Sequence, residues 1–148
     1  MTDDSHMVAA RADFSVLVVD DNPGDLLLAA HVLRASQFVQ QVLEARSADE
    51  ALDLFRSAEQ NPPSLVFLDM AMPRKSGADF LVDFAELRER RGYDETFVVI
   101  LSSAGGVEER PPRTDYPFVI DSLDKPLRTG DLQRLGDLLQ SLRKDEAR

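Results

Sequence analysis

Polar side chains suited to phosphoryl chemistry stand where short apolar runs of this sequence end. Asp20 and Asp21 follow one run, Asp69 ends a second, Ser102 ends a third, and Lys125 comes soon after a fourth. Carboxylates held close together repel one another and raise each other's pKa unless a cation is present. Because the candidate donors are oxygen atoms, with no His or Cys beside them, the pattern predicts a site for a hard divalent ion such as Mg²⁺.

The same residues could accept a phosphoryl group. With a metal ion cancelling charge, one carboxylate can act as the nucleophile. Lys125 can neutralise a phosphoryl oxygen as a point charge, and Ser102 can donate a hydrogen bond to another. Taken singly, each residue has a plainer explanation as a helix-entry acid, a loop acid, a helix cap or a surface lysine. Their joint occurrence in this order favours the phosphoryl-accepting site.

These residues can meet only if their strands run parallel in one sheet, because ligands of such sheets bind at the carboxyl ends of the strands. Helix-start signals at Asn22, Ser47 and Ser76 separate the apolar runs. Alternation of strands and amphipathic helices predicts an α/β fold with a doubly wound, five-stranded parallel sheet. The predicted strands are Phe14–Val19, Gln41–Ala45, Leu65–Leu68, Phe97–Leu101 and Phe118–Ile120.

One interval interrupts this alternation. After Leu101 the sequence continues "SSAGGVEERPPRTDYP", which contains Gly105-Gly106 and Pro111-Pro112. Because adjacent prolines cannot lie inside a long helix, we expect a shortened or irregular fourth helix of one or two turns. We predict a flexible extension at residues 1–13, one domain at 14–142 and a flexible tail at 143–148.

Composition limits the classes of partner. The 148 residues carry a net charge of −10 and contain no cysteine. The negative charge makes nucleic acid and anionic membrane surfaces poor partners, so we expect protein partners, no disulfide and no thiolate metal site. The amino-terminal residues lack the apolar run of a signal peptide, and no stretch is apolar enough to span a membrane. We therefore expect a cytoplasmic protein that is a monomer or a weak homodimer.

Four motifs resemble the receiver domain of two-component response regulators, of the single-domain, chemotaxis-regulator-like kind. They are VLVVDDNPGD at 16–25, LVFLDMAMPRKSG at 65–77, VVILSS at 98–103 and DKP at 124–126. The resemblance covers Phe14 to Leu142. It implies a flavodoxin-like (βα)5 fold and a signalling domain that catalyses its own phosphorylation and dephosphorylation, rather than an enzyme acting on a separate substrate.

The resemblance also implies a role for each matched residue. Asp69 corresponds to the phosphoacceptor, which receives phosphate from a histidine kinase or a histidine phosphotransfer protein. Ser102 matches the switch hydroxyl, and Lys125 matches the lysine that pairs with the phosphoryl group, with a cis bond to Pro126 expected by analogy. The implied Mg²⁺ ligands are Asp20, Asp21, Asp69 and the backbone carbonyl of Ala71.

The sequence departs from the family pattern at three positions. Receivers usually carry Tyr or Phe three residues before the lysine, where this chain has Ser122, so the usual coupling between hydroxyl and aromatic is altered. Ala71 and Ala104 occupy positions that in the family tune the lifetime of the aspartyl phosphate, and these two residues predict neither a long nor a short lifetime. The possible jobs are a switch acting through protein contacts, a phosphorelay step or a phosphate sink.

Three other functions fit the sequence less well. A pseudo-receiver that binds a protein without being phosphorylated is favoured by Ser122 and the interrupted fourth helix, but the complete set of site residues argues against it. A phosphatase with an Asp nucleophile requires a second acid at the position of Ala71. A flavodoxin-like cofactor module would need hydroxyls and glycines in place of Asp20 and Asp21.

Overall fold

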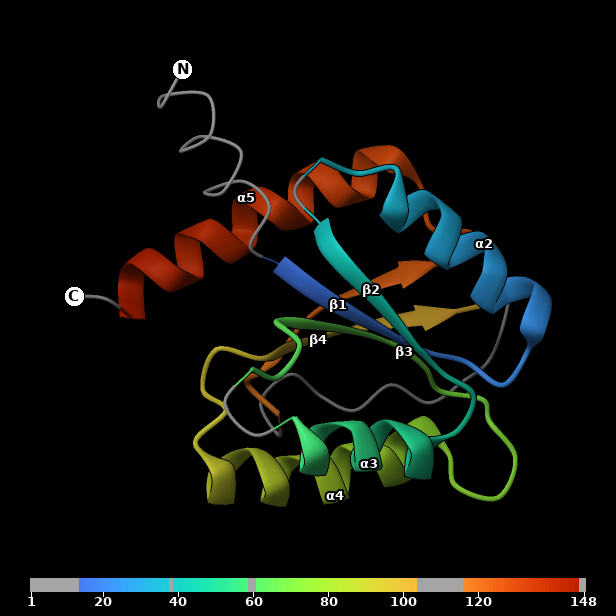
Figure 1. Ribbon diagram of the computed structural model, residues 1–148. Coiled ribbons are helices and arrows are strands. Elements are labelled where there is room, and N and C mark those ends of the chain that lie inside the picture. The colour runs from blue at the N-terminus through green and yellow to red at the C-terminus, as the bar shows by residue number, and fades with distance from the viewer. Residues whose placement is uncertain (1–13, 38, 59–60, 104–115, 147–148) are drawn as a thin grey trace.

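The computed structural model describes residues 14–37, 39–58, 61–103 and 116–146 (Figure 1). Strands and helices alternate along the chain, with β4 leading to β5 through residues outside this description. The elements are β1 (Phe14–Val19), α2 (Pro23–Arg34), β2 (Val39–Ala45), α3 (Ala48–Ser57), β3 (Leu65–Asp69), α4 (Gly77–Arg91), β4 (Phe97–Ser102), β5 (Val119–Asp124) and α5 (Thr129–Glu146).

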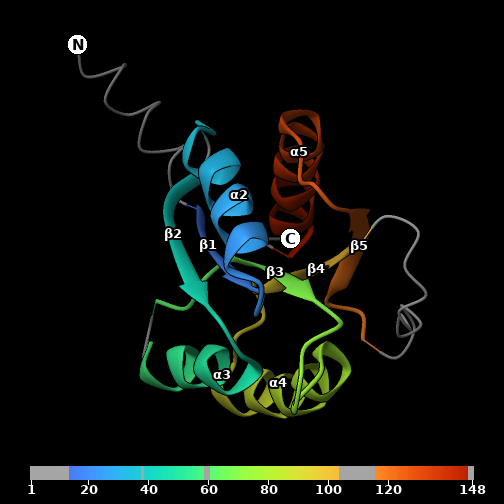
Figure 2. The ribbon, with the colours of Figure 1, turned by 90° about the vertical axis from the view of Figure 1, so that its right-hand side faces the viewer.

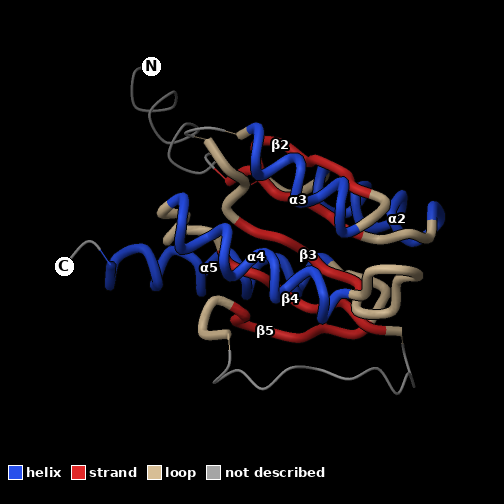
Figure 3. The backbone as a smooth tube through the Cα atoms, turned by 90° about the horizontal axis from the view of Figure 1, so that it is seen from below, coloured by secondary structure: helices blue, strands red, loops and turns tan. Residues whose placement is uncertain are grey.

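The strands form one parallel five-stranded sheet in the order β2-β1-β3-β4-β5. Helices α2 and α5 cover one face of this sheet, and α3 and α4 cover the other (Figures 2 and 3). The strand order reverses after β1, because β2 lies on one side of β1 while β3 lies on the other. The predicted doubly wound, flavodoxin-like fold is confirmed.

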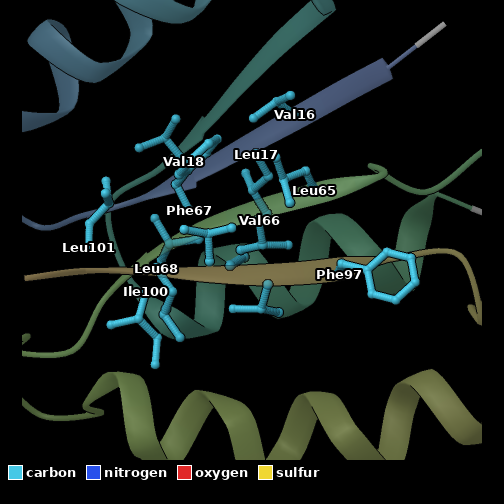
Figure 4. Packing of buried hydrophobic residues seen from close by; sticks show 14 of the residues in the cluster. Val16, Leu17, Val18, Leu65, Val66, Phe67, Leu68, Phe97, Ile100 and Leu101 are labelled. Carbon is cyan, nitrogen blue, oxygen red and sulfur yellow. The ribbon is translucent and has the colours of Figure 1, made fainter. Parts of the chain in front are cut away.

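The core is built on the three inner strands. Nearly every residue of β1, β3 and β4 is buried, because helices pack on both faces of the sheet. Figure 4 shows the side chains of these strands interleaved, with Val66 and Phe67 of β3 between those of β1 and β4. This burial explains why the inner strands are continuous apolar runs.

Capping residues fix the points at which the loops after the strands end and the helices begin. The residues Asn22, Ser47 and Ser76 cap α2, α3 and α4, and each side-chain oxygen accepts the N–H of the third helical residue. At Ser76 the third residue, Asp79, also accepts the N–H of the cap, which completes a capping box. All three predicted helix starts are confirmed.

Several element boundaries differ from the predicted ones, most clearly in β5 and α5. Strand β5 continues to Asp124, beyond the predicted end at Ile120. It pairs only with β4 and lies at an edge of the described sheet, so it tolerates polar residues such as Asp121 that an inner strand would exclude (Figure 3). Helix α5 continues to Glu146 through part of the predicted tail, because its last residues favour helix and include no Gly or Pro.

Other predictions fall outside the described residues. The shortened fourth helix and Ala104 lie within 104–115, and the amino-terminal extension is 1–13. Among the described helices, none combines the length and the apolar character needed to cross a membrane.

Candidate functional site

The strand-end residues gather at one edge of the sheet, the one formed by the carboxyl ends of the parallel strands. Asp20 follows β1, Asp69 ends the neighbouring strand β3, Ser102 ends β4, and Lys125 directly follows β5. Carboxylate oxygens of Asp20, Asp21 and Asp69 all lie within 4.8 Å of one another. The sheet order thus brings together residues that are far apart in the sequence.

Asp69 is a buried carboxylate held from one side by the backbone. Its side chain belongs to a residue only 5% exposed, and its Oδ1 accepts the N–H of Ala71 at 3.2 Å. Burial, together with the nearby negative charge of Asp20, raises the pKa of Asp69 from its usual 3.8 to about 6, although the Ala71 N–H and Lys125 act in the opposite direction. At neutral pH the group is mainly ionised and therefore nucleophilic.

The ammonium group of Lys125 is shared among carboxylates. Its Nζ lies 2.7 Å from Asp20 Oδ2, 3.0 Å from Asp25 Oδ2 and 3.8 Å from Asp69 Oδ1. Burial lowers the pKa of Lys125, but the hydrogen bonds to Asp20 and Asp25 outweigh burial, so its pKa is raised. The Lys125–Pro126 peptide bond is cis, as predicted.

Asp25 is a site residue that the sequence did not reveal. Its place in the first turn of α2, where negative charge is favourable, already gives this acid a plainer structural role. A usable signal was present, because α2 begins directly after β1, so the first turn of α2 lies at the same edge of the sheet as Asp20. The contact with Lys125 nevertheless depends on how the segment after β5 is placed.

Ser102 and Ser122 lie on the neighbouring strands β4 and β5. Ser102 is buried, and its carbonyl accepts the N–H of Lys125 at 2.7 Å, which ties the end of β4 to the lysine. Ser122 pairs with Ile100 in the β4–β5 register, two residues before the end of β4. The Ser122 hydroxyl is buried and has no hydrogen-bond partner among the described residues. The position of the usual aromatic is thus filled by a small side chain.

The donor set fits Mg²⁺. Asp20, Asp25 and Asp69 lie close to the Lys125 ammonium, and Asp21 lies close to Asp20 and Asp69, so in the described part of the site the carboxylates exceed the single ammonium. Oxygen donors and this excess charge are what a hard divalent ion requires. Participation of the Ala71 carbonyl stays a prediction.

The loop after Asp69 packs directly on the start of α4. Gly77 donates its N–H to the Met70 carbonyl at 3.1 Å, and a Cβ at Gly77 would lie 2.7 Å from Met70 Cα and 2.8 Å from the Asp69 carbonyl oxygen. Glycine is required here by close backbone approach. Helix α4 therefore packs against the backbone at Asp69, the predicted nucleophile.

The same loop contains a strained residue, Arg74, whose φ is +66° and whose side chain is exposed. Left-handed backbone costs an ordinary L-residue about 1 to 2 kcal/mol, and glycine avoids this cost. Arg74→Gly is therefore expected to raise the free energy of unfolding by about 0.5 to 1 kcal/mol in urea denaturation. Arg90→Gly, the same exchange on an exposed turn of α4, should lower it by a similar amount. Equal losses in both variants would contradict the assignment of strain to Arg74.

A flavodoxin-like sheet with an acid cluster, a hydroxyl residue and a lysine at one edge is the arrangement of receiver domains. A family model described as the response regulator receiver domain matches residues 16–135. The chain belongs to the response regulator receiver domain family, whose members in general accept phosphoryl groups, bind Mg²⁺ at an acidic pocket and interact with histidine kinases or phosphotransfer proteins.

Individual relatives agree with this family. The two-component response regulator ORR6 of Oryza sativa subsp. japonica is 32% identical over 85% of this chain and 71% of its own length. Two other curated relatives are longer, and the chain spans 35% and 56% of them.

Solved receiver structures share the fold. A CheY-like receiver from Methanospirillum hungatei has a TM-score of 0.69 at 19% identity, covering 89% of this chain and 98% of its own. The receiver of the histidine kinase CKI1 from Arabidopsis thaliana, solved with Mg²⁺, has a TM-score of 0.62 at 21% identity, covering 88% and 92%.

Proposed function

We propose that this receiver accepts a phosphoryl group on Asp69 from a histidine kinase or a histidine phosphotransfer protein, with Mg²⁺ required. The observation that carries the proposal is the buried, ionisable carboxylate of Asp69 among the acids of the strand edge and beside the Lys125 ammonium. An isolated acid at the end of a strand would have no reason to be surrounded in this way.

The chain's own residues divide the work of phosphoryl transfer. The Ala71 N–H holds Oδ1 of Asp69, which orients the carboxylate so that its other oxygen attacks phosphorus as the bond to the donor breaks. Asp20, Asp21 and Asp69 would hold Mg²⁺, which when bound supplies positive charge opposite the phosphoryl oxygens. Lys125 pairs with one phosphoryl oxygen, and the Ser102 hydroxyl donates to another.

The signalling output follows from contacts with other proteins, as a switch, a relay step or a phosphate sink. The same residues that accept the group then promote its hydrolysis, so the domain acts on its own phosphate. Ser122 favours one competing function, a binding module that works without phosphorylation, because no aromatic ring is available there to change position. The two functions differ in whether Asp69 gains phosphate.

Incubation with acetyl phosphate and Mg²⁺, followed by intact mass measurement, tests the proposal. The wild-type protein should gain one phosphoryl group, and neither Asp69→Asn nor the EDTA-treated protein should gain it. Because a short-lived aspartyl phosphate escapes mass measurement, binding of beryllofluoride, a stable phosphoryl mimic, is measured in parallel. If the folded wild-type protein neither gains phosphate nor binds beryllofluoride, the result favours the phosphorylation-independent module.

A further inference from the structure

The Lys125 ammonium forms hydrogen bonds with Asp20 and Asp25 rather than with Asp69, the predicted nucleophile. An ammonium has three N–H donors. Two of them are taken up at 2.7 Å by Asp20 and at 3.0 Å by Asp25, whereas Asp69 Oδ1 at 3.8 Å is beyond hydrogen-bond distance. Before phosphorylation, therefore, the strongest contacts of Lys125 are with the two other acids.

These two partners are not equally able to release Lys125. Asp20 is only 2% exposed, and its Oδ1 also accepts the N–H of Asn22 at 3.0 Å, so its carboxylate is held in place. The side chain of Asp25 is 39% exposed. Its backbone N–H is bonded to the Asn22 cap, so the start of α2 stays fixed whether or not the side chain contacts Lys125. Asp25 is the partner that water can replace.

We propose that Asp25 is a positioning residue that competes with the phosphoryl group on Asp69 for the ammonium of Lys125. This proposal rests on phosphoryl acceptance at Asp69. A phosphoryl group brings new negative oxygens close to Asp69, and Lys125 turns toward them as its contact with Asp25 is lost. Asp25 thereby limits how tightly the site holds a phosphoryl group, and it links the first turn of α2 to the occupancy of the site.

Beryllofluoride binding, followed by ¹⁹F NMR at a fixed saturating Mg²⁺ concentration, tests the competition. Asp25→Asn removes the charge and keeps the shape, so it should tighten beryllofluoride binding by about three- to tenfold, the scale of one partly exposed ion pair. Asp25→Glu restores the charge and should bind within about twofold of wild type. A merely structural role of Asp25 would leave this affinity unchanged.

Two controls separate competition for Lys125 from other effects of charge. Asp79→Asn removes an acid from the equivalent third position of α4, where the carboxylate caps Ser76, and should leave the affinity unchanged. When the titrations are repeated with about 0.5 M added NaCl, Asp25→Asn should still bind beryllofluoride more tightly than wild type. A close contact to a largely buried ammonium is screened less by salt than long-range repulsion is.

The outcomes distinguish failure of phosphoryl acceptance on Asp69 from failure of the proposed competition by Asp25. Absence of beryllofluoride binding in wild type overturns phosphoryl acceptance and this inference with it. Binding in wild type with equal or weaker binding in Asp25→Asn overturns the competition alone. A gain that disappears at high salt, or that Asp79→Asn reproduces, assigns the effect to general repulsion. A tenfold or larger loss of Mg²⁺ affinity in Asp25→Asn, measured by calorimetry without beryllofluoride, makes Asp25 a metal ligand and overturns the inference.

Discussion

Gly77→Ala is expected to lower the free energy of unfolding by about 1 to 3 kcal/mol and to slow phosphorylation of Asp69 by about tenfold or more. The added Cβ would stand 2.7 Å from Met70 Cα and 2.8 Å from the Asp69 carbonyl oxygen, which are backbone atoms that cannot rotate away. Relief of these contacts requires the loop after β3 to shift against α4. Because Asp69 begins that loop, its carboxylate shifts as well.

Urea denaturation and the rate of phosphate gain from acetyl phosphate measure the two effects. Gly130→Ala is the matched control, since Gly130 also lies in the first turn of a helix but has no neighbouring atom within 4 Å of an added Cβ. Alanine there should leave stability unchanged or raise it by up to about 1 kcal/mol, because alanine favours helix. Equal behaviour of the two variants would show that the close approach at Gly77 is not needed.

Asp69→Asn is expected to stabilise the metal-free protein at pH 7.5 by roughly 2 to 3 kcal/mol. The pKa of Asp69 is raised from 3.8 to about 6 by burial and by the charge of Asp20. The folded protein therefore binds this proton more tightly than the unfolded chain, so the contribution of Asp69 to stability is present below pH 3.8 and is lost as pH rises through about 6. Asparagine carries no charge at any of these pH values.

Urea denaturation in EDTA, across the pH range that brackets this pKa, measures the difference between Asp69→Asn and wild type. The difference should be largest at neutral pH and should narrow toward pH 4, near the usual pKa of the carboxyl. Asp137→Asn, which removes an exposed acid from α5, controls for the general effect of charge. Mg²⁺ should stabilise wild type more than Asp69→Asn, because only the former keeps the full carboxylate set. A difference that does not vary with pH would contradict the raised pKa.

Much of the fold could be predicted because its signals are local. The apolar runs ending at Val19 and Leu101 are long enough to indicate strands buried on both faces, and the caps at Asn22 and Ser76 mark helix starts from a few neighbouring residues. Polar residues of an edge strand weaken this signal, which is why the end of β5 was missed. The candidate site could be named because each predicted acid lies at the end of a strand or just after it.

The sequence by itself determined the parallel fold, the edge at which the site forms and the residue types that gather there. Only the tertiary structure decided the contacts among them. Lys125 meets Asp25 across 100 positions of the chain, Gly77 meets the backbone of Met70, and the Ser122 hydroxyl is buried without a described partner. Periodicity and capping act over a few residues, whereas these contacts depend on strand order, register and side-chain conformation, which form only when the whole sheet is assembled.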